Sequence, residues 1–236
     1  EHLLRRADLS DSDRERAQYA LAQDFLKAGL IDRAEDALRQ LDGTRHQEQA
    51  WLTLLALQER ARDWPEAAAT ARRLQQAGLG DFSGRLAHYL CEQADQALNR
   101  RKDAPAAREL LELAIREAPG SARPRIQLAG LLASQDHMDQ AFEQLSQLDA
   151  HAPQSIPLIA SELVRIAQRT DQLPRAVDIL RHSYAVTPAI DVADALVQAD
   201  LAGGVPLQQA REGYVRHMAQ EPSLIAAMRW LSHEPF

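Results

Sequence analysis

Apolar residues recur along this chain in short helical stripes that come in pairs. The first stripe holds Ala17, Leu21, Phe25 and Ala28. After Gly29 a second stripe holds Ile31, Ala34, Leu38 and Leu41. Apolar residues three or four positions apart share one face of a helix, and a glycine after the last of them is typical of a helix end. Residues 12–45 therefore predict two amphipathic helices that pack against each other.

The start of the first helix carries a capping signal. Ser12 is followed three residues later by Glu15, and in such a capping box the hydroxyl accepts from the first turn while the carboxylate reaches back. Ser12 is therefore predicted to cap the helix. Residues 1–6 are predicted to be the tail of an earlier helix whose partner is missing, so the sequence is expected to be a fragment.

The second half of the chain repeats at a fixed interval. Four alanines are each followed twelve residues later by a proline, and both advance by 34, 35 and 34 residues from one pair to the next. The pairs are Ala107 with Pro119, Ala141 with Pro153, Ala176 with Pro188, and Ala210 with Pro222. A methyl side chain lets two helices approach closely, and a proline cannot continue the helix that it follows. The alanines are therefore predicted to be buried at helix crossings.

These patterns predict an all-α protein, a right-handed superhelical solenoid of antiparallel helix pairs in one array over residues 1–236. The glycine-rich stretch at 77–84 predicts a loop, after which one long helix runs from Ser83 to about Arg101. The predicted pairs span residues 12–45, 46–78, 83–120, 122–154, 156–189 and 190–222, with partial helices at 1–6 and 223–233.

The composition narrows the function classes. Lys and Arg number 27 against 34 Asp and Glu, a net charge of -7, so the surface as a whole does not suit a nucleic-acid backbone. The single cysteine, Cys91, excludes an intramolecular disulfide framework and a thiolate zinc cluster, and fits a reducing compartment. No run of 18 apolar residues and no signal-peptide core is present, so the chain as given is predicted to be soluble.

No catalytic motif stands out. A phosphate-binding glycine loop, G-x-S-x-G and H-E-x-x-H are all absent. His88 and Cys91, three apart, could form half of a metal site, but a packed cysteine beside a histidine on the helix flank is favoured. Glu109 and Glu112 could be an acid/base pair, but a solvated helix face explains them better. The sequence therefore predicts no enzyme, and no metal or cofactor site in this fragment.

Pairs of helices in units of about 34 residues, with a small residue at the crossing and a proline after the second helix, resemble the tetratricopeptide repeat. Three segments narrow the resemblance: AGLIDRAEDALRQL (28–41), AHYLCE (87–92) and EAPGSAR (117–123). In the same order, they are similar to the cytoplasmic repeat region of the lipopolysaccharide assembly protein B (LapB) family of bacterial inner-membrane proteins. The similarity covers nearly the whole chain.

That resemblance implies a non-catalytic protein–protein interaction scaffold. In the family, an N-terminal membrane anchor precedes the repeats, and a C-terminal rubredoxin-like knuckle of four cysteines binds metal; neither part is in this chain. Family members are adaptors at the cytoplasmic face of the inner membrane. They help a membrane-bound ATP-dependent protease degrade the deacetylase that commits precursor to lipid A, and so restrain lipopolysaccharide synthesis.

The implied partners are that protease and other lipopolysaccharide-assembly proteins, with no nucleic acid, and with membrane contact only through the missing anchor. Two other readings stay open. One is a generic peptide-binding repeat module with an unrelated cell-envelope or secretion client. The other is a regulator or enzyme whose active part lies outside this fragment.

The resemblance also implies where a partner binds. In such repeats the first helix of each pair lines a concave groove, at fixed offsets from its first core position. Up to residue 189 these offsets select seven cations and two anions, which favours an acidic or carboxylate-bearing client over the alternative of an unused, solvated face. Tyr19 and Tyr89 are the aromatic residues placed on this face. The last pair offers only Val192, Ala195, Ala199, Ala202 and Gly203. The predicted partner-binding residues are Tyr19, Gln23, Lys27, Arg60, Glu92, Gln96, Asn99, Arg100, Arg123, Arg165, Gln168 and Arg169.

Overall fold

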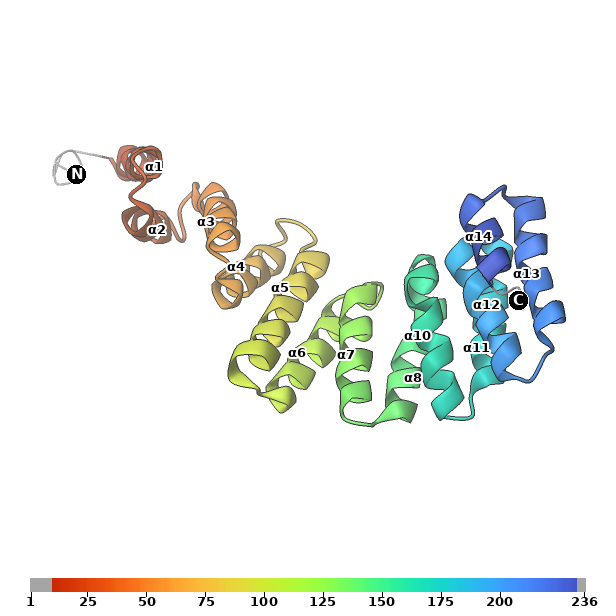
Figure 1. The fold of residues 1–236 in the computed structure, drawn as a ribbon. Helices are drawn as coiled ribbons and strands as arrows, with labels where there is room; N and C mark the ends of the chain where they lie inside the picture. The colour runs from red at the N-terminus through yellow and green to blue at the C-terminus, as the bar shows by residue number, and fades with distance from the viewer. Residues whose placement is uncertain (1–9, 233–236) are drawn as a thin grey trace. The chain divides into compact units, whose positions relative to one another are not determined.

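The computed structural model describes residues 10–232, and every regular element within that range is a helix (Figure 1). The all-α prediction is thus confirmed for this range. The chain divides into two compact units, one up to Lys102 and one from Asp103. This division falls inside the helix pair predicted at 83–120, and the single array over residues 1–236 stays a prediction. The partial helix expected at 1–6 lies outside the described residues.

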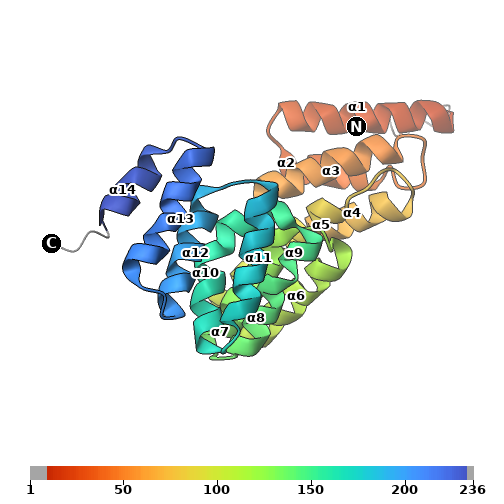
Figure 2. The same cartoon turned by 90° about the vertical axis from the view of Figure 1, so that its right-hand side faces the viewer.

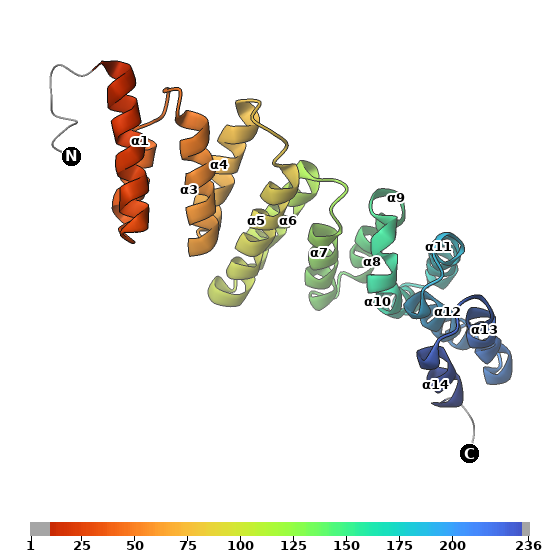
Figure 3. The ribbon, with the colours of Figure 1, turned by 90° about the horizontal axis from the view of Figure 1, so that it is seen from above.

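Unit 1 consists of helices joined by short loops, and each packs on the next along the chain (Figure 3). They are α1 (Asp11–Lys27), α2 (Ile31–Arg39), α3 (Gln47–Ala61), α4 (Trp64–Gln76) and α5 (Ser83–Gln96), which continues into a π-helical turn (Ala97–Arg101). The long helix predicted from Ser83 to about Arg101 is therefore present, and its last turn is widened.

Apolar clusters join successive helices of unit 1. One joins α1, α2 and α3 through Ala22, Leu38 and Leu54. The other joins α3, α4 and α5 through Leu55, Trp64, Ala67, Leu74, Phe82, Leu86 and Tyr89. Each fully buried leucine of this kind stabilises the fold by roughly 1.5 to 3 kcal/mol relative to its exposed state. Of the two stripes read from residues 12–45, Phe25, Leu38 and Leu41 belong to the first cluster, whereas Ala28 and Ile31 are exposed.

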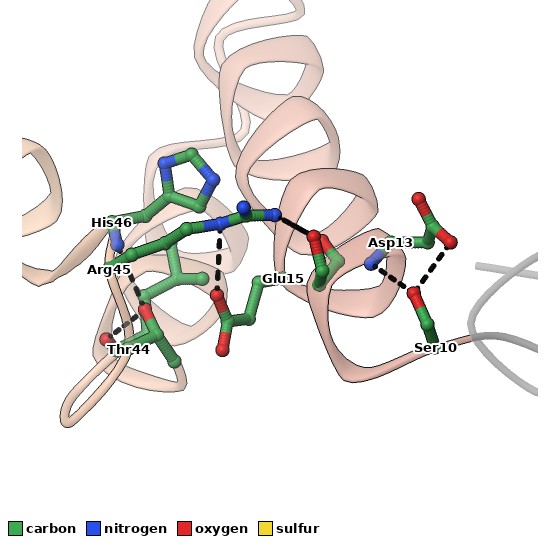
Figure 4. Close-up of polar contacts among 8 residues, drawn as sticks. Ser10, Asp13, Glu15, Thr44, Arg45 and His46 are labelled. Carbon is green, nitrogen blue, oxygen red and sulfur yellow. Dashed lines mark hydrogen bonds and ion pairs between the residues drawn. The ribbon is translucent and has the colours of Figure 1, made fainter.

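The predicted cap of the first helix is wrong by two residues, as Figure 4 shows. Ser10 is the N-cap, and its hydroxyl accepts a hydrogen bond from the backbone N–H of Asp13 at 3.2 Å. Glu15 does not reach back to a cap, because its carboxylate pairs with Nε of Arg45 at 3.3 Å. The same guanidinium donates to the backbone oxygen of Ser12 at 2.8 Å. Arg45, in the loop after α2, therefore contacts both residues of the expected capping box, Ser12 and Glu15.

Unit 2 continues the pattern of helix pairs. Its helices are α6 (Ala104–Glu117), α7 (Ala122–Ser134), α8 (Met138–Ser146), α9 (Leu148–His151), α10 (Ile156–Arg169), α11 (Leu173–Val186), α12 (Ile190–Ala202), α13 (Leu207–Gln220) and α14 (Leu224–Ser232). A 3-10 turn, Pro153–Ser155, precedes α10. Figure 2 shows α10, α12 and α13 side by side, and neighbouring members of this row are in contact. The helix expected at 223–233 is α14.

The predicted spacing of alanines and prolines is confirmed in unit 2. Ala107, Ala141, Ala176 and Ala210 are each the fourth residue of a second helix, and each is 0 % exposed. Each of the four prolines stands two residues after the helix that it follows. Close approach of two helices at a methyl side chain explains why these positions are small.

The first helices close with a common backbone turn. Shortly after each first helix up to α12, one residue has a positive φ; the six residues are Gly29, Arg62, Lys102, Asp136, Asp171 and Gly204. This left-handed conformation ends a helix by folding the chain back on its last turn. Four of the six are not glycine, so these turns contain strain that the sequence pattern did not reveal.

Candidate protein-binding surface

The predicted partner-binding residues all lie on first helices or their direct continuations. In unit 1, α1 carries Tyr19, Gln23 and Lys27, α3 carries Arg60, α5 carries Glu92 and Gln96, and the π-helical turn carries Asn99 and Arg100. In unit 2, α7 carries Arg123, and α10 carries Arg165, Gln168 and Arg169. We call the last four residues the first-helix surface of unit 2.

Exposure separates these residues into two sets. Lys27, Arg60, Asn99, Arg100, Arg165, Gln168 and Arg169 are exposed, whereas Tyr19, Gln23, Glu92, Gln96 and Arg123 are half-buried. Tyr19 packs on the core cluster of α1 to α3, and its ring stacks on His46 with 5.2 Å between centroids. Tyr19 therefore helps to hold its helix in place, and only part of the ring faces solvent.

Tyr89 was expected on the open face, and this expectation is wrong: the residue is 0 % exposed. Its hydroxyl donates to Glu59, and Arg85 donates to both partners, at 3.0 Å to the hydroxyl and 2.8 Å to the carboxylate. Burial and the bond to Glu59 raise the pKa of Tyr89 to about 12. The three side chains join α3 to α5, so this part of the face is occupied by an internal network.

Glu59 stays ionised within this network. Burial acts to raise its pKa, but the hydrogen bonds from Tyr89 and Arg85 and the charge of Arg85 outweigh it and lower the pKa below its usual 4.5. Glu59 is one of the two anions that the groove offsets select, whereas Arg85 is not among the residues that they select. The sequence signal for this ion pair was the opposite charge of Arg85 on the next first helix, 26 positions after Glu59.

The cations of α10 already have anionic neighbours. Nε of Arg165 donates to Glu162 on the same helix at 2.7 Å, and this bond raises the pKa of the guanidinium against the opposing effect of burial. Nη2 of Arg169 donates to Asp136 at 2.7 Å, across from the turn that follows α7. Neither carboxylate was selected by the groove offsets. The excess of positive charge on the first-helix surface of unit 2 is therefore smaller than the offsets indicate.

Gln168 lies beside an open pocket. The pocket has a volume of about 560 Å³ and lies between the ends of α10 and α12, where Asp171, Leu173 and Ala202 complete its lining. The predicted surface does not continue along α12, because Val192, Ala195 and Ala199 are buried. These residues pack among the helices that contact α12, so the groove offsets do not hold for the last pair.

The residues considered above as catalytic or metal-binding candidates are engaged in contacts within the fold. Cys91 is buried, and His88 meets the ring edges of Trp64 and Tyr89 with centroids 5.6 and 5.8 Å apart. Glu112, considered above as half of an acid/base pair with Glu109, forms an ion pair with Arg108 at 2.8 Å. No group of three potential metal ligands occurs among residues 10–232. Within the same range, none of the helices is both long and apolar enough to cross a bilayer.

Comparison with known proteins agrees with the fold. A tetratricopeptide-repeat family model matches residues 98–161, and the helix pairs of that segment agree with such repeats. Nearly the whole chain is also similar to lipopolysaccharide assembly protein B of Escherichia coli strain K12. The two are 27% identical over 225 residues, which cover 94% of this chain and 57% of that protein. The protein of the same name from Escherichia coli O157:H7 matches equally.

The resemblance to lipopolysaccharide assembly protein B is therefore confirmed, at modest identity, and the chain spans little more than half the length of that relative. Among solved structures, the type IV pilus biogenesis factor PilW is 16% identical with a TM-score of 0.45, and it aligns with 94% of this chain and 100% of its own. MamA is 12% identical with a TM-score of 0.46, over 75% of this chain and 92% of its own. Neither structure bears on the function of this chain.

Proposed function

We propose that this chain is the repeat region of a non-catalytic scaffold in lipopolysaccharide assembly. The observation that carries the proposal is the similarity to lipopolysaccharide assembly protein B along 94% of the chain. The helix pairs support it, because stacked pairs offer extended surfaces for protein partners. The absence of a catalytic motif in the sequence agrees with a scaffold.

The proposed role is that of an adaptor at the cytoplasmic face of the bacterial inner membrane. In this role the chain brings the deacetylase that commits precursor to lipid A to a membrane-bound ATP-dependent protease.

The proposed client-binding site includes the first-helix surface of unit 2. Arg165 and Arg169 each expose half of their side chain, 50 % in both cases, so an acidic segment can reach them. When such a segment binds, its carboxylates replace Glu162 and Asp136 as acceptors of the arginine hydrogen bonds. The net gain in binding free energy at each arginine is therefore limited. A single Arg to Ala change is expected to weaken binding by about 1 to 3 kcal/mol if the contact is desolvated, and by well under 1 kcal/mol at an exposed rim.

A binding titration tests the role. The purified chain is titrated with the purified deacetylase and, separately, with the membrane protease in detergent, and the helices of an unrelated tetratricopeptide-repeat protein serve as the control. Saturable binding of either protein by this chain, and not by the control, is expected. If neither protein binds, the role in lipopolysaccharide assembly is wrong, and the generic peptide-binding module becomes the better description.

A further inference from the structure

A second pocket of unit 2 is lined by none of the residues of the first-helix surface. It opens between α6, α7 and α8, all within unit 2, and has a volume of about 440 Å³. Second helices α6 and α8 supply most of its wall. Three arginines line it: Arg108, Arg116 and Arg125.

Arg125 is a buried cation without a carboxylate partner. It is 6 % exposed, and its guanidinium Nη1 donates to the amide oxygen of Gln147 and, at 3.4 Å, to that of Gln144. Its Nε is buried and has no acceptor. Burial lowers the pKa of Arg125. Buried charges are ordinarily paired with an opposite charge, so this arginine has an unmet requirement for an anion.

The two carboxylates in the pocket wall do not meet that requirement. Glu112 pairs with Arg108 at 2.8 Å, and Glu143 pairs with Arg175 at 3.3 Å. Among the described residues no carboxylate forms an ion pair with Arg116 or Arg125. The wall therefore contains two arginines that no acidic side chain of this range neutralises.

The rest of the lining selects the kind of anion. Ile115, Leu128 and Leu132 give the wall an apolar part, and Gln140, Gln144 and Gln147 give it amide groups. An apolar wall favours an organic anion over inorganic phosphate, and the nearby Glu112 and Glu143 repel a dianion more strongly than a single carboxylate. Amide side chains can bond to the backbone of an extended peptide.

We propose that this pocket binds a protein segment in which one carboxylate side chain stands between apolar residues. The carboxylate accepts from Arg125 and Arg116, the apolar neighbours contact Leu128 and Ile115, and the glutamines bond to the peptide backbone. The hydrogen bond from Arg125 to Gln144 is weak at 3.4 Å, and it is the one that breaks when the carboxylate binds. This site is separate from the first-helix surface, so it can be right or wrong independently of the client proposed above.

The test is a fluorescence-anisotropy titration of the whole chain with a labelled peptide, Ala-Leu-Glu-Leu-Ala, capped at both ends. The same peptide with Gln in place of Glu is the control ligand. We expect the Glu peptide to bind at least about tenfold more tightly, because a charge-assisted hydrogen bond in a partly buried site is stronger than a neutral one. Equal affinity of the two peptides overturns the proposal.

Variants locate the binding. Arg125→Met is expected to weaken binding of the Glu peptide by about tenfold or more and the exposed Arg116→Gln by about threefold. The control Arg181→Gln, at an exposed position of α11 outside the pocket, should leave affinity within a factor of two. Arg125→Met should also unfold at no lower temperature than the parent, because it removes a buried charge held only by neutral groups.

Two outcomes contradict the proposal. If Arg125→Met does not fold, Arg116→Gln decides, and unchanged affinity in that variant overturns it. If inorganic phosphate displaces the peptide at concentrations similar to those at which free acetate does so, the pocket is a general anion site and the peptide assignment is wrong.

Discussion

At the scale of single residues, the backbone strain at the ends of first helices is open to a direct test. Arg62 has φ of 57° and Lys102 has φ of 55°, in a conformation that costs a side-chain-bearing residue roughly 1 to 2 kcal/mol. Gly29 and Gly204 occupy the corresponding turns of the first and last pairs without that strain. The turn is thus a shared requirement that glycine meets best.

Arg62→Gly is therefore expected to stabilise the fold. The residue is exposed at the C-terminal cap of α3, and removal of the left-handed strain should raise the free energy of unfolding by about 0.5 to 1 kcal/mol, after the larger entropy of the unfolded glycine chain is subtracted. Urea denaturation measures the change. Arg60→Gly, inside the same helix, is the control and should destabilise by about 1 kcal/mol.

The crossing alanines give a second prediction. Ala141 is fully buried where α8 packs on its neighbours, so Ala141→Leu should overpack the site and lower the free energy of unfolding by about 1 to 3 kcal/mol. Ala185→Leu, at an exposed position of α11, is the matched control and should change stability by less than about 0.5 kcal/mol. Equal melting temperatures for the two variants would contradict the assignment of Ala141 to a crossing.

The Glu59 network predicts a dependence on pH. The folded-state pKa of Glu59 lies below 4.5, so its contribution is present above the unfolded pKa and is lost as the pH falls through the folded pKa. Glu59→Gln should cost about 1 kcal/mol at pH 7, a small amount because Arg85 and Glu59 expose 44% and 34% of their side chains and solvent screens the pair.

That difference between the parent and Glu59→Gln should disappear in acid, below the folded pKa. Glu48→Gln changes the same charge at an exposed position of the same helix, and it should have little effect at either pH. Denaturation curves of the three proteins at pH 7 and in acid provide the comparison. A difference that persists in acid would show that the side chain acts by packing and not by charge.

At the scale of helices, the sequence predicts the pairs well and their ends less well. The 3.6-residue period of apolar residues locates each helix, because one apolar face must be buried. The regular spacing of alanines and prolines locates the second helices of unit 2. The first cap was misplaced because Ser10 and Ser12 are each followed three residues later by an acidic residue, Asp13 and Glu15. The choice between them depends on Arg45, which lies in the loop after α2.

The ion pair between the turn after α7 and Arg169 of α10 was not predicted from the sequence. The partners Asp136 and Arg169 are 33 residues apart, close to the repeat length, and Asp136 lies in the left-handed turn that follows α7. Repeat offsets describe where a side chain starts on its helix. They do not describe which neighbour its charged end reaches, or that a tyrosine such as Tyr89 turns inward.

At the scale of the whole molecule, two different surfaces of unit 2 are assigned to partners. The first-helix surface includes the half-exposed side chains of Arg165 and Arg169, and the pocket beside α7 contains the buried Arg125. The sequence indicated the first through repeat offsets. It could not indicate the second, because an unpaired buried arginine is recognisable only once its neighbours are placed.

The most direct test of the scaffold account compares two double charge reversals by calorimetric titration against the deacetylase. Arg165→Glu with Arg169→Glu alters the first-helix surface, and Arg181→Glu with Arg216→Glu makes the same change in net charge on the second helices α11 and α13. With helicity intact in both, the account predicts that the first variant binds at least about tenfold more weakly than the parent and the second binds within a factor of about two. Equal affinity of the two variants would contradict it.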